Sequence, residues 1–173
     1  MRQKLFILFL VLLITPNLCN AQTDEPTEIF PTQDTYIDSY KPNSNYGNQT
    51  LKVGEFLEEK RTAIIRFEDI PTDIESMKLY LDIWGVYETY DVIFYFIFDE
   101  DMKDWDEYSL TWLNWVYDYN ITYGVNDAEN YTTQITDSVY GYINMTEYIG
   151  HTAFDVVICT PVTQEDYFYI TQR

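Results

Sequence analysis

Aromatic side chains suited to sugar binding gather in one polar stretch of the chain. A pyranose ring has an apolar face of C–H bonds and a rim of hydroxyls, so its binding needs flat aromatic faces beside hydrogen-bonding groups. Tyr117, Tyr119 and Tyr123 lie in a loop-like stretch and are the candidate platforms. Tyrosine is also enriched in strands and cores, so core packing is the competing interpretation for all three.

A second kind of chemistry belongs to the few basic residues on predicted strands, which are able to hold a ligand carboxylate. Arg61 and Arg66 lie in one alternating run, although Arg66 has Glu68 and Asp69 nearby as alternative ion-pair partners. The chain holds 10 Lys and Arg against 29 Asp and Glu, a formal net charge of −19. This charge repels phosphate backbones and excludes nucleic acid as a partner. It also repels an acidic polysaccharide over a Debye length of about 8 Å, so a neutral glycan, or an acidic one bridged by calcium, fits better.

Calcium is the cofactor that the oxygen-bearing side chains favour. Hard cations bind several carboxylate, amide and carbonyl oxygens, often on loops. Asp34 and Asp38 followed by Asn43 and Asn45 form one candidate cluster, and the carboxylates between residues 99 and 106 form another. The competing interpretation is that these Asp and Asn side chains stabilise turns through the neighbouring backbone.

Catalysis and zinc binding have little support in the residue pattern. With 29 acidic residues, some pair of carboxylates will always resemble a glycosidase pair, so such a pair carries no information. The chain has no nucleophile elbow, phosphate loop or metalloprotease helix motif. One His and two Cys supply too few ligands for a structural zinc site. We therefore expect a protein that is not an enzyme.

The first 21 residues have the pattern of a secretory signal peptide. Two basic residues precede an apolar run at residues 5–14, a proline follows, and small residues end at Ala21. The apolar run is too short to cross a bilayer, so we expect a secreted, extracellular protein without membrane insertion after cleavage. Residues 22–30 then form an acidic linker or arm, and residues 31–173 form the domain. Secretion also suits the four N-glycosylation sequons, which begin at Asn48, Asn120, Asn130 and Asn144.

The remaining chain has the two-residue period of β-strands. Residues 61–68, 77–83, 154–159 and 167–171 alternate between apolar and polar side chains, and Pro, Asn, Asp and Gly clusters separate them. Seven or more short strands with turns between them predict an all-β fold, an antiparallel β-sandwich. The run 92–98 (VIFYFIF) is apolar on both faces. It indicates a central strand covered on both sides, the alternative being a face that forms a ligand or partner surface.

Several blocks of this sequence occur in an order that resembles a known domain family. They are residues 31–38 (PTQDTYID), 42–47 (PNSNYG), 51–54 (LKVG), 61–67 (RTAIIRF), 74–81 (IESMKLYL), 105–112 (WDEYSLTW) and 143–149 (INMTEYI). Together they resemble the DNRLRE domain, also described as carbohydrate-binding module family 96, over residues 29–171. The resemblance implies a secreted jelly-roll sandwich that binds polysaccharide, with acidic polysaccharides among the family's ligands. It also implies that Trp105 and Trp112 pack structurally.

The chain departs from this family at its end. The family follows the strand that resembles residues 167–171 with a closing strand, and residue 173 precedes that strand here. Either the sequence is a fragment of a longer chain, or the sheet has an open edge. Such an edge is able to pair with another strand, with residues 22–33 of a neighbouring chain as the candidate.

Two functions follow from these patterns. The first is a secreted, non-catalytic module that binds an extracellular or cell-wall polysaccharide, with calcium assisting. The alternative is a structural or adhesive surface protein whose open edge and aromatic face bind other protein chains and lead to self-association.

Overall fold

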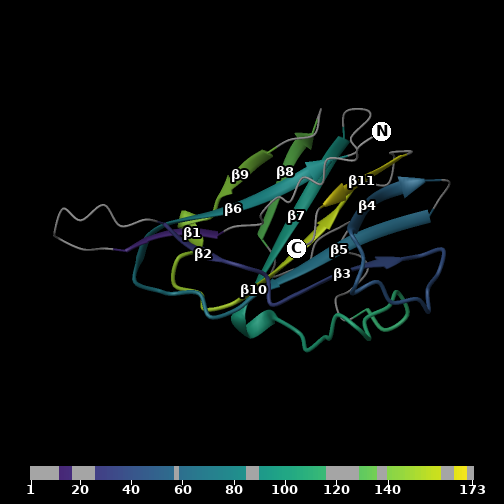
Figure 1. Ribbon diagram of the computed structural model, residues 1–173, viewed down its shortest axis with the longest axis horizontal. Helices are drawn as coiled ribbons and strands as arrows, with labels where there is room; N and C mark the ends of the chain where they lie inside the picture. The colour runs from purple at the N-terminus through teal and green to yellow at the C-terminus, as the bar shows by residue number, and fades with distance from the viewer. Residues whose placement is uncertain are drawn as a thin grey trace, which may run out of the picture.

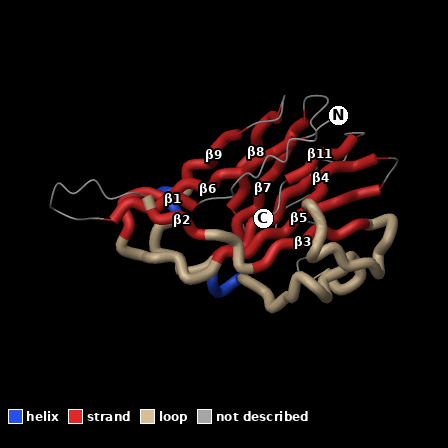
Figure 2. Tube along the Cα trace, viewed as in Figure 1, coloured by secondary structure: helices blue, strands red, loops and turns tan. Residues whose placement is uncertain are grey.

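The computed structural model describes residues 12–16, 26–56, 59–84, 90–115, 129–135, 140–160 and 166–170, and it confirms the predicted all-β sandwich (Figures 1 and 2). Within these ranges, helical structure is confined to two single-turn 3₁₀ segments, η1 (Asp99–Asp101) and η3 (Thr146–Tyr148). The strands are β1 (Leu12–Pro16), β2 (Thr27–Ile29), β3 (Gln33–Asp38), β4 (Leu51–Phe56), β5 (Glu59–Phe67), β6 (Ile74–Trp84), β7 (Tyr90–Phe98), β8 (Glu129–Ile135), β9 (Tyr140–Asn144), β10 (Phe154–Cys159) and β11 (Asp166–Ile170).

The strand pairs among these elements are all antiparallel. The main path runs β2-β1-β6-β11-β4-β5-β10-β7-β8, with β3 paired to β5 and β9 paired to β6. The register between β5 and β10 is fixed because both strands bury both of their faces. In this register Asp155 of β10 lies opposite Arg66 of β5. A one-residue slip there would move a charged pair into the apolar core, so the sequence itself selects the register.

The main core lies between the two layers of the sandwich. The layer containing β6 contributes Met77, Leu79 and Leu81, and the layer containing β5, β7 and β10 contributes side chains such as Phe94 and Phe154. All are at least nine-tenths buried, and each such side chain contributes about 1.5–3 kcal/mol of hydrophobic stabilisation. The alternation predicted for β5, β6 and β10 is confirmed for the side chains that the structure describes. The predicted inward-facing residues that belong to this core are Ala63, Ile65, Phe67, Met77, Leu79, Leu81, Phe154, Val156 and Ile158.

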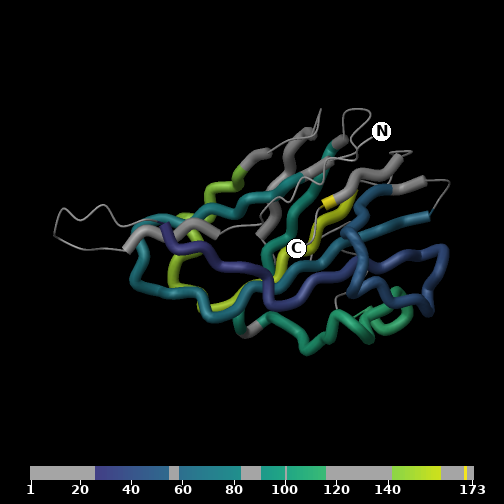
Figure 3. Tube along the Cα trace, viewed as in Figure 1, coloured from purple at the N-terminus to yellow at the C-terminus, as the bar shows by residue number. Residues whose placement is uncertain are grey.

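A second hydrophobic cluster covers the opposite face of the same layer; we call it the outer cluster. Tyr95 and Ile97 of β7 pack there against Trp105 and Leu110 of the following loop. That loop, residues 102–115, runs along the lower side of the sheet in the teal to green colours of Figure 3 and is called the tryptophan loop below. The prediction that the strand at 92–98 is covered on both faces is therefore confirmed, and the tryptophan loop is the cover.

Two strands precede the main body of the domain. β1 falls within the predicted signal peptide and lies between β2 and β6, whereas β2 falls within the arm that the sequence indicated to be linker-like. Among the described residues there is no helix with the length and apolar character that crossing a membrane requires.

Candidate functional site

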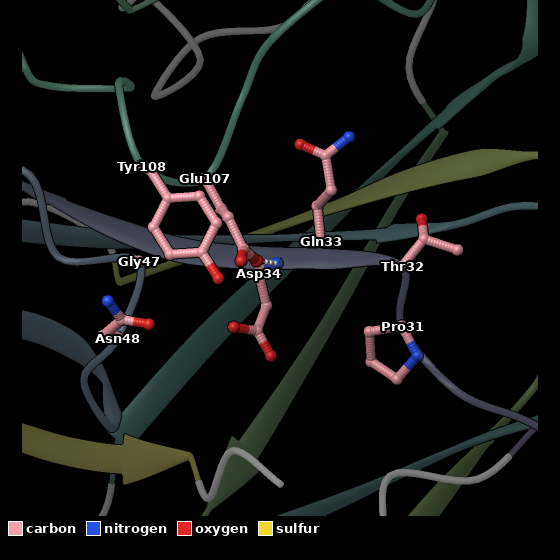
Figure 4. A pocket seen from close by; sticks show the side chains of 8 residues that line it. All are labelled: Pro31, Thr32, Gln33, Asp34, Gly47, Asn48, Glu107 and Tyr108. Carbon is pink, nitrogen blue, oxygen red and sulfur yellow. Dashed lines mark hydrogen bonds between the residues drawn. The ribbon is translucent and has the colours of Figure 1, made fainter.

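A polar groove of about 290 Å³ opens where three segments meet. The approach to β3 and its first residues form one wall, the loop between β3 and β4 forms a second, and the tryptophan loop forms the third (Figure 4). Its lining residues are Pro31, Thr32, Gln33, Asp34, Gly47, Asn48, Glu107 and Tyr108. The groove therefore combines one aromatic ring with carboxylates, amides and a hydroxyl.

The two loops that form the groove are joined by side-chain and backbone hydrogen bonds. Asn45 Nδ2 donates to the carbonyls of Glu107 at 2.6 Å and Leu110 at 2.8 Å, while its Oδ1 accepts from the Gly47 amide at 3.2 Å. A Cβ atom at Gly47 would collide with the Glu107 carbonyl. Figure 3 shows the two loops side by side at the lower right, far apart in sequence but adjacent in space. The groove walls are consequently held together by the Asn45 side chain, in a close approach that only glycine at position 47 permits.

Tyr108 is the aromatic residue among the side chains that line the groove. It is 59% exposed, and a turn in which its amide donates to Asp106 Oδ1 at 3.0 Å fixes the local backbone. A hydrogen bond with the neighbouring Glu107 carboxylate, together with nearby acidic charges, raises the pKa of the Tyr108 phenol. The phenol therefore stays neutral at physiological pH, and its ring remains available as a flat apolar face.

Hydrogen-bonding groups surround this ring. Glu107 Oε2 accepts from the Asp34 backbone amide at 3.2 Å, and both side chains line the groove (Figure 4). Thr32 Oγ1 donates to Glu68 Oε2 at 2.8 Å, just outside the groove. Ionised carboxylates only accept hydrogen bonds, so the site suits a ligand rich in hydroxyl donors. Their charge opposes an acidic ligand.

The sequence profile of carbohydrate-binding module family 96 matches residues 25–165. The chain belongs to this family. The match confirms the resemblance drawn from the sequence blocks, and it covers the groove and all of the two hydrophobic clusters except Ile170. A search of curated proteins found no match to the chain.

Within this family 96 module, the aromatic platforms predicted from sequence cannot be compared with the groove. Tyr117, Tyr119 and Tyr123 lie outside the described residues. The groove instead contains Tyr108, an aromatic residue of the same region that the sequence did not single out. Tyr108 could not be predicted as a groove residue from the sequence, because the groove forms where residues 42–47 contact the tryptophan loop. No local sequence pattern indicates a contact between segments about 60 residues apart.

The two predicted glycan-binding arginines lie apart from the groove, since neither lines it. Arg61 Nε lies 2.9 Å from Asp38 Oδ2, and its Nη2 lies 3.8 Å from Glu59 Oε2. Arg66 is only 6% exposed; its Nε and Nη2 each donate to the Asp155 carboxylate at 2.8 Å. In this structure, both guanidinium groups contact the protein's own carboxylates.

Arg66 is the centre of a buried network that holds the tryptophan loop. Its Nη2 also donates to the Lys103 carbonyl at 2.6 Å, and its guanidinium lies 5.1 Å from the Trp105 ring centre. Trp105 Nε1 completes the network by donating to Asp155 Oδ2 at 2.9 Å. Trp112 packs against the outer cluster. Both tryptophans thus pack structurally, as the family resemblance implied.

The residues predicted to bind calcium have other contacts in the fold. Asp38 accepts from the Tyr40 amide and from Arg61, and Asn45 joins the loops described above. Asp34 lines the groove, and Asn43 is exposed. In the part of the chain that the structure describes, no three His, Cys, Asp or Glu side chains form a cluster able to hold a metal. These contacts match the turn-forming interpretation for Asp38 and Asn45, and calcium stays a prediction.

The second acidic run serves the fold through Asp99. Its Oδ1 accepts from the Thr152 amide at 3.1 Å and the Ala153 amide at 3.0 Å, and its Oδ2 lies 2.7 Å from His151 Nδ1. Burial alone would raise the pKa of Asp99, but these hydrogen bonds together lower it. Asp99 therefore anchors the segment that leads into β10.

Two of the four sequons have described side chains. Asn48 is exposed at the groove, and Asn144 is exposed with its Oδ1 accepting from the Thr146 amide at 3.2 Å. Asn120 lies outside the described residues, and Asn130 lies on β8, where only the backbone is described. Glycosylation at all four stays a prediction.

Proposed function

We propose that this family 96 module is a secreted, non-catalytic protein whose groove binds one sugar unit of a neutral extracellular polysaccharide. The exposed Tyr108 ring beside Asp34 and Glu107 is the observation that carries the proposal. The ring stacks on the apolar face of the sugar, and the carboxylates accept hydrogen bonds from its hydroxyls. Family membership supports carbohydrate as the ligand class.

Charge supports the choice of a neutral ligand. Removal of residues 1–21 takes away Arg2 and Lys4 and no acidic residue, so the net charge falls from −19 to −21. The described groove lining contains two carboxylates and no basic side chain. An acidic polysaccharide would enter only if a cation such as calcium bridged it to Asp34 and Glu107. Binding that requires calcium would therefore identify an acidic polysaccharide as the ligand.

Affinity electrophoresis through neutral and acidic polysaccharides, first with calcium and then with chelator, tests this function. The protein is produced without N-glycosylation, because a glycan on Asn48 would occupy the groove. We expect one neutral polymer to retard the protein in both conditions. Tyr108→Ala lowers the affinity about tenfold or more, since an anchoring tyrosine contributes on the order of 1.4 kcal/mol or above.

Tyr40→Ala is the matched control, because Tyr40 is 64% exposed and does not line the groove. It should leave retardation unchanged. Uniform mobility of the folded protein in every gel would overturn the proposed function. Equal losses for Tyr108→Ala and Tyr40→Ala would show that the groove is not the site.

A further inference from the structure

β1 occupies one edge of β6. Leu12 lies opposite Leu79, Leu13 opposite Lys78, and Ile14 opposite Met77. Lys78 and Leu79 also pair with β9, so β1 and β9 lie on opposite edges of β6. Removal of β1 would therefore expose unpaired backbone groups along residues 74–79.

The side chains along this edge make an open state costly. Met77 and Leu79 are 1% and 0% exposed and belong to the main core. Without a strand beside them, the edge would combine unpaired backbone groups with accessible core residues. Such an edge is a template for pairing with another strand.

Removal of β1 would also leave β2 without the strand on which it lies. Glu28 lies opposite Leu13, and Leu13 in turn lies opposite Lys78, so Glu28 and Lys78 face the same side of the sheet. Ile29 packs against the main core, on the side of Met77 and Leu79. β2 therefore already has Glu28 on the outer side of the sheet and Ile29 on the core side, as a replacement for β1 needs.

We propose that, once the leader is removed, β2 of a second copy of this chain takes the place of β1 beside β6. This proposal rests on the secretion step of the proposed function. The expected register pairs Glu28 of one copy with Lys78 of the other. It places Thr27 opposite Leu79 and Ile29 opposite Met77, with both facing the core. The acidic arm of one copy thus lies beside Lys78 of the other, one of the few basic residues of the chain. This charge complementarity favours β2 of a second copy as the strand that pairs with β6.

Strand direction explains why the second copy, and not the chain's own arm, fills the edge. β2 and β6 are both antiparallel to β1, so within one chain they run parallel to each other. The arm is fixed at its base, where the Thr32 amide donates to the Arg66 carbonyl at 2.9 Å. A copy related by a two-fold axis perpendicular to the strands presents β2 in the antiparallel direction. The exchange is reciprocal, so it closes at a dimer.

The test uses the full chain with a protease site inserted after Ala21, so that folding precedes cleavage. Sedimentation analysis gives the mass before and after cleavage, and refolded residues 22–173 give a second route to the processed chain. We expect a monomer before cleavage and a dimer after it, by either route. Lys78→Glu weakens the dimer about tenfold, because two symmetric ion pairs are lost. Glu28→Lys combined with Lys78→Glu restores it.

Lys41→Glu is the matched control, since it makes the same charge change at an exposed loop residue. It should leave the dimer unchanged. A processed chain that stays monomeric or unfolds, or a full chain that already dimerises, would overturn the proposal, as would failure of the charge-reversed pair to restore the dimer. Polysaccharide retardation of the same processed protein reports on the groove separately, so failure of one proposal is distinguishable from failure of the other.

Discussion

Asp155 is the residue whose replacement most directly tests the buried network. It is 0% exposed and accepts two hydrogen bonds from Arg66 and one from Trp105. Asp155→Ala leaves the Arg66 charge buried without this carboxylate, and removing one member of a buried pair costs about 3–5 kcal/mol. Domains of this size have free energies of unfolding of about 5–15 kcal/mol, so the loss is a large fraction of the total.

Urea unfolding followed by circular dichroism measures this loss. Arg66→Met combined with Asp155→Leu should lose less than Asp155→Ala alone, because the double variant buries apolar groups in place of an uncompensated charge. Asp73→Ala, at an exposed loop residue, is the control and should change stability by less than about 0.5 kcal/mol. A loss below about 1 kcal/mol for Asp155→Ala, or a double variant no more stable than the single one, would refute the reasoning.

Three further outcomes are expected. Gly47→Ala forces a Cβ atom against the Glu107 carbonyl and should cost about 1–3 kcal/mol in urea unfolding; unchanged stability would show that the loops separate freely. The folded pKa of Asp99 lies below its ordinary value of 3.8, so its stabilisation is present above that value and is lost as the pH falls through the folded pKa. Asp99→Asn should therefore cost about 1–2 kcal/mol at pH 7 and progressively less in acid, and an equal cost at pH 7 and pH 3 would contradict this. Burial raises the pKa of the Cys159 thiol to about 12, so a thiol reagent at pH 8 should label it only on unfolding. Labelling is read at Cys159 itself, because the chain also holds Cys19, and rapid labelling of Cys159 in the native protein would count against the burial.

The positions of the strands were predictable because the alternation of apolar and polar residues follows from which side chains each strand buries. β5, β6 and β10 follow the expected alternation, and the two-sided apolar character of residues 92–98 correctly indicated cover on both faces. The sequence left open which element provides that cover. The choice depends on the path of the tryptophan loop, which no periodicity encodes.

Pairing between distant residues was the part that sequence reasoning could not supply. Arg66 has acidic neighbours two and three residues ahead, yet Asp155 lies opposite it because β5 and β10 pair in that register. The groove depends in the same way on Asn45 reaching the Glu107 carbonyl. Such contacts follow from strand order and loop path, which are properties of the assembled sheet.

The position of the tryptophan loop has a consequence for how this chain avoids aggregation during synthesis. Residues 92–98 of β7 form the kind of apolar, uncharged segment that forms intermolecular sheets when exposed. The loop that shields it follows within a few residues and emerges directly after it, but Asp155, which fixes Trp105, lies 50 residues further on. Until Asp155 has been synthesised, the tryptophan loop can pack on β7, but Arg66 has no Asp155 carboxylate with which to form the buried ion pair. Variants at Asp155 should therefore lower the yield of folded protein by more than their equilibrium stability alone accounts for.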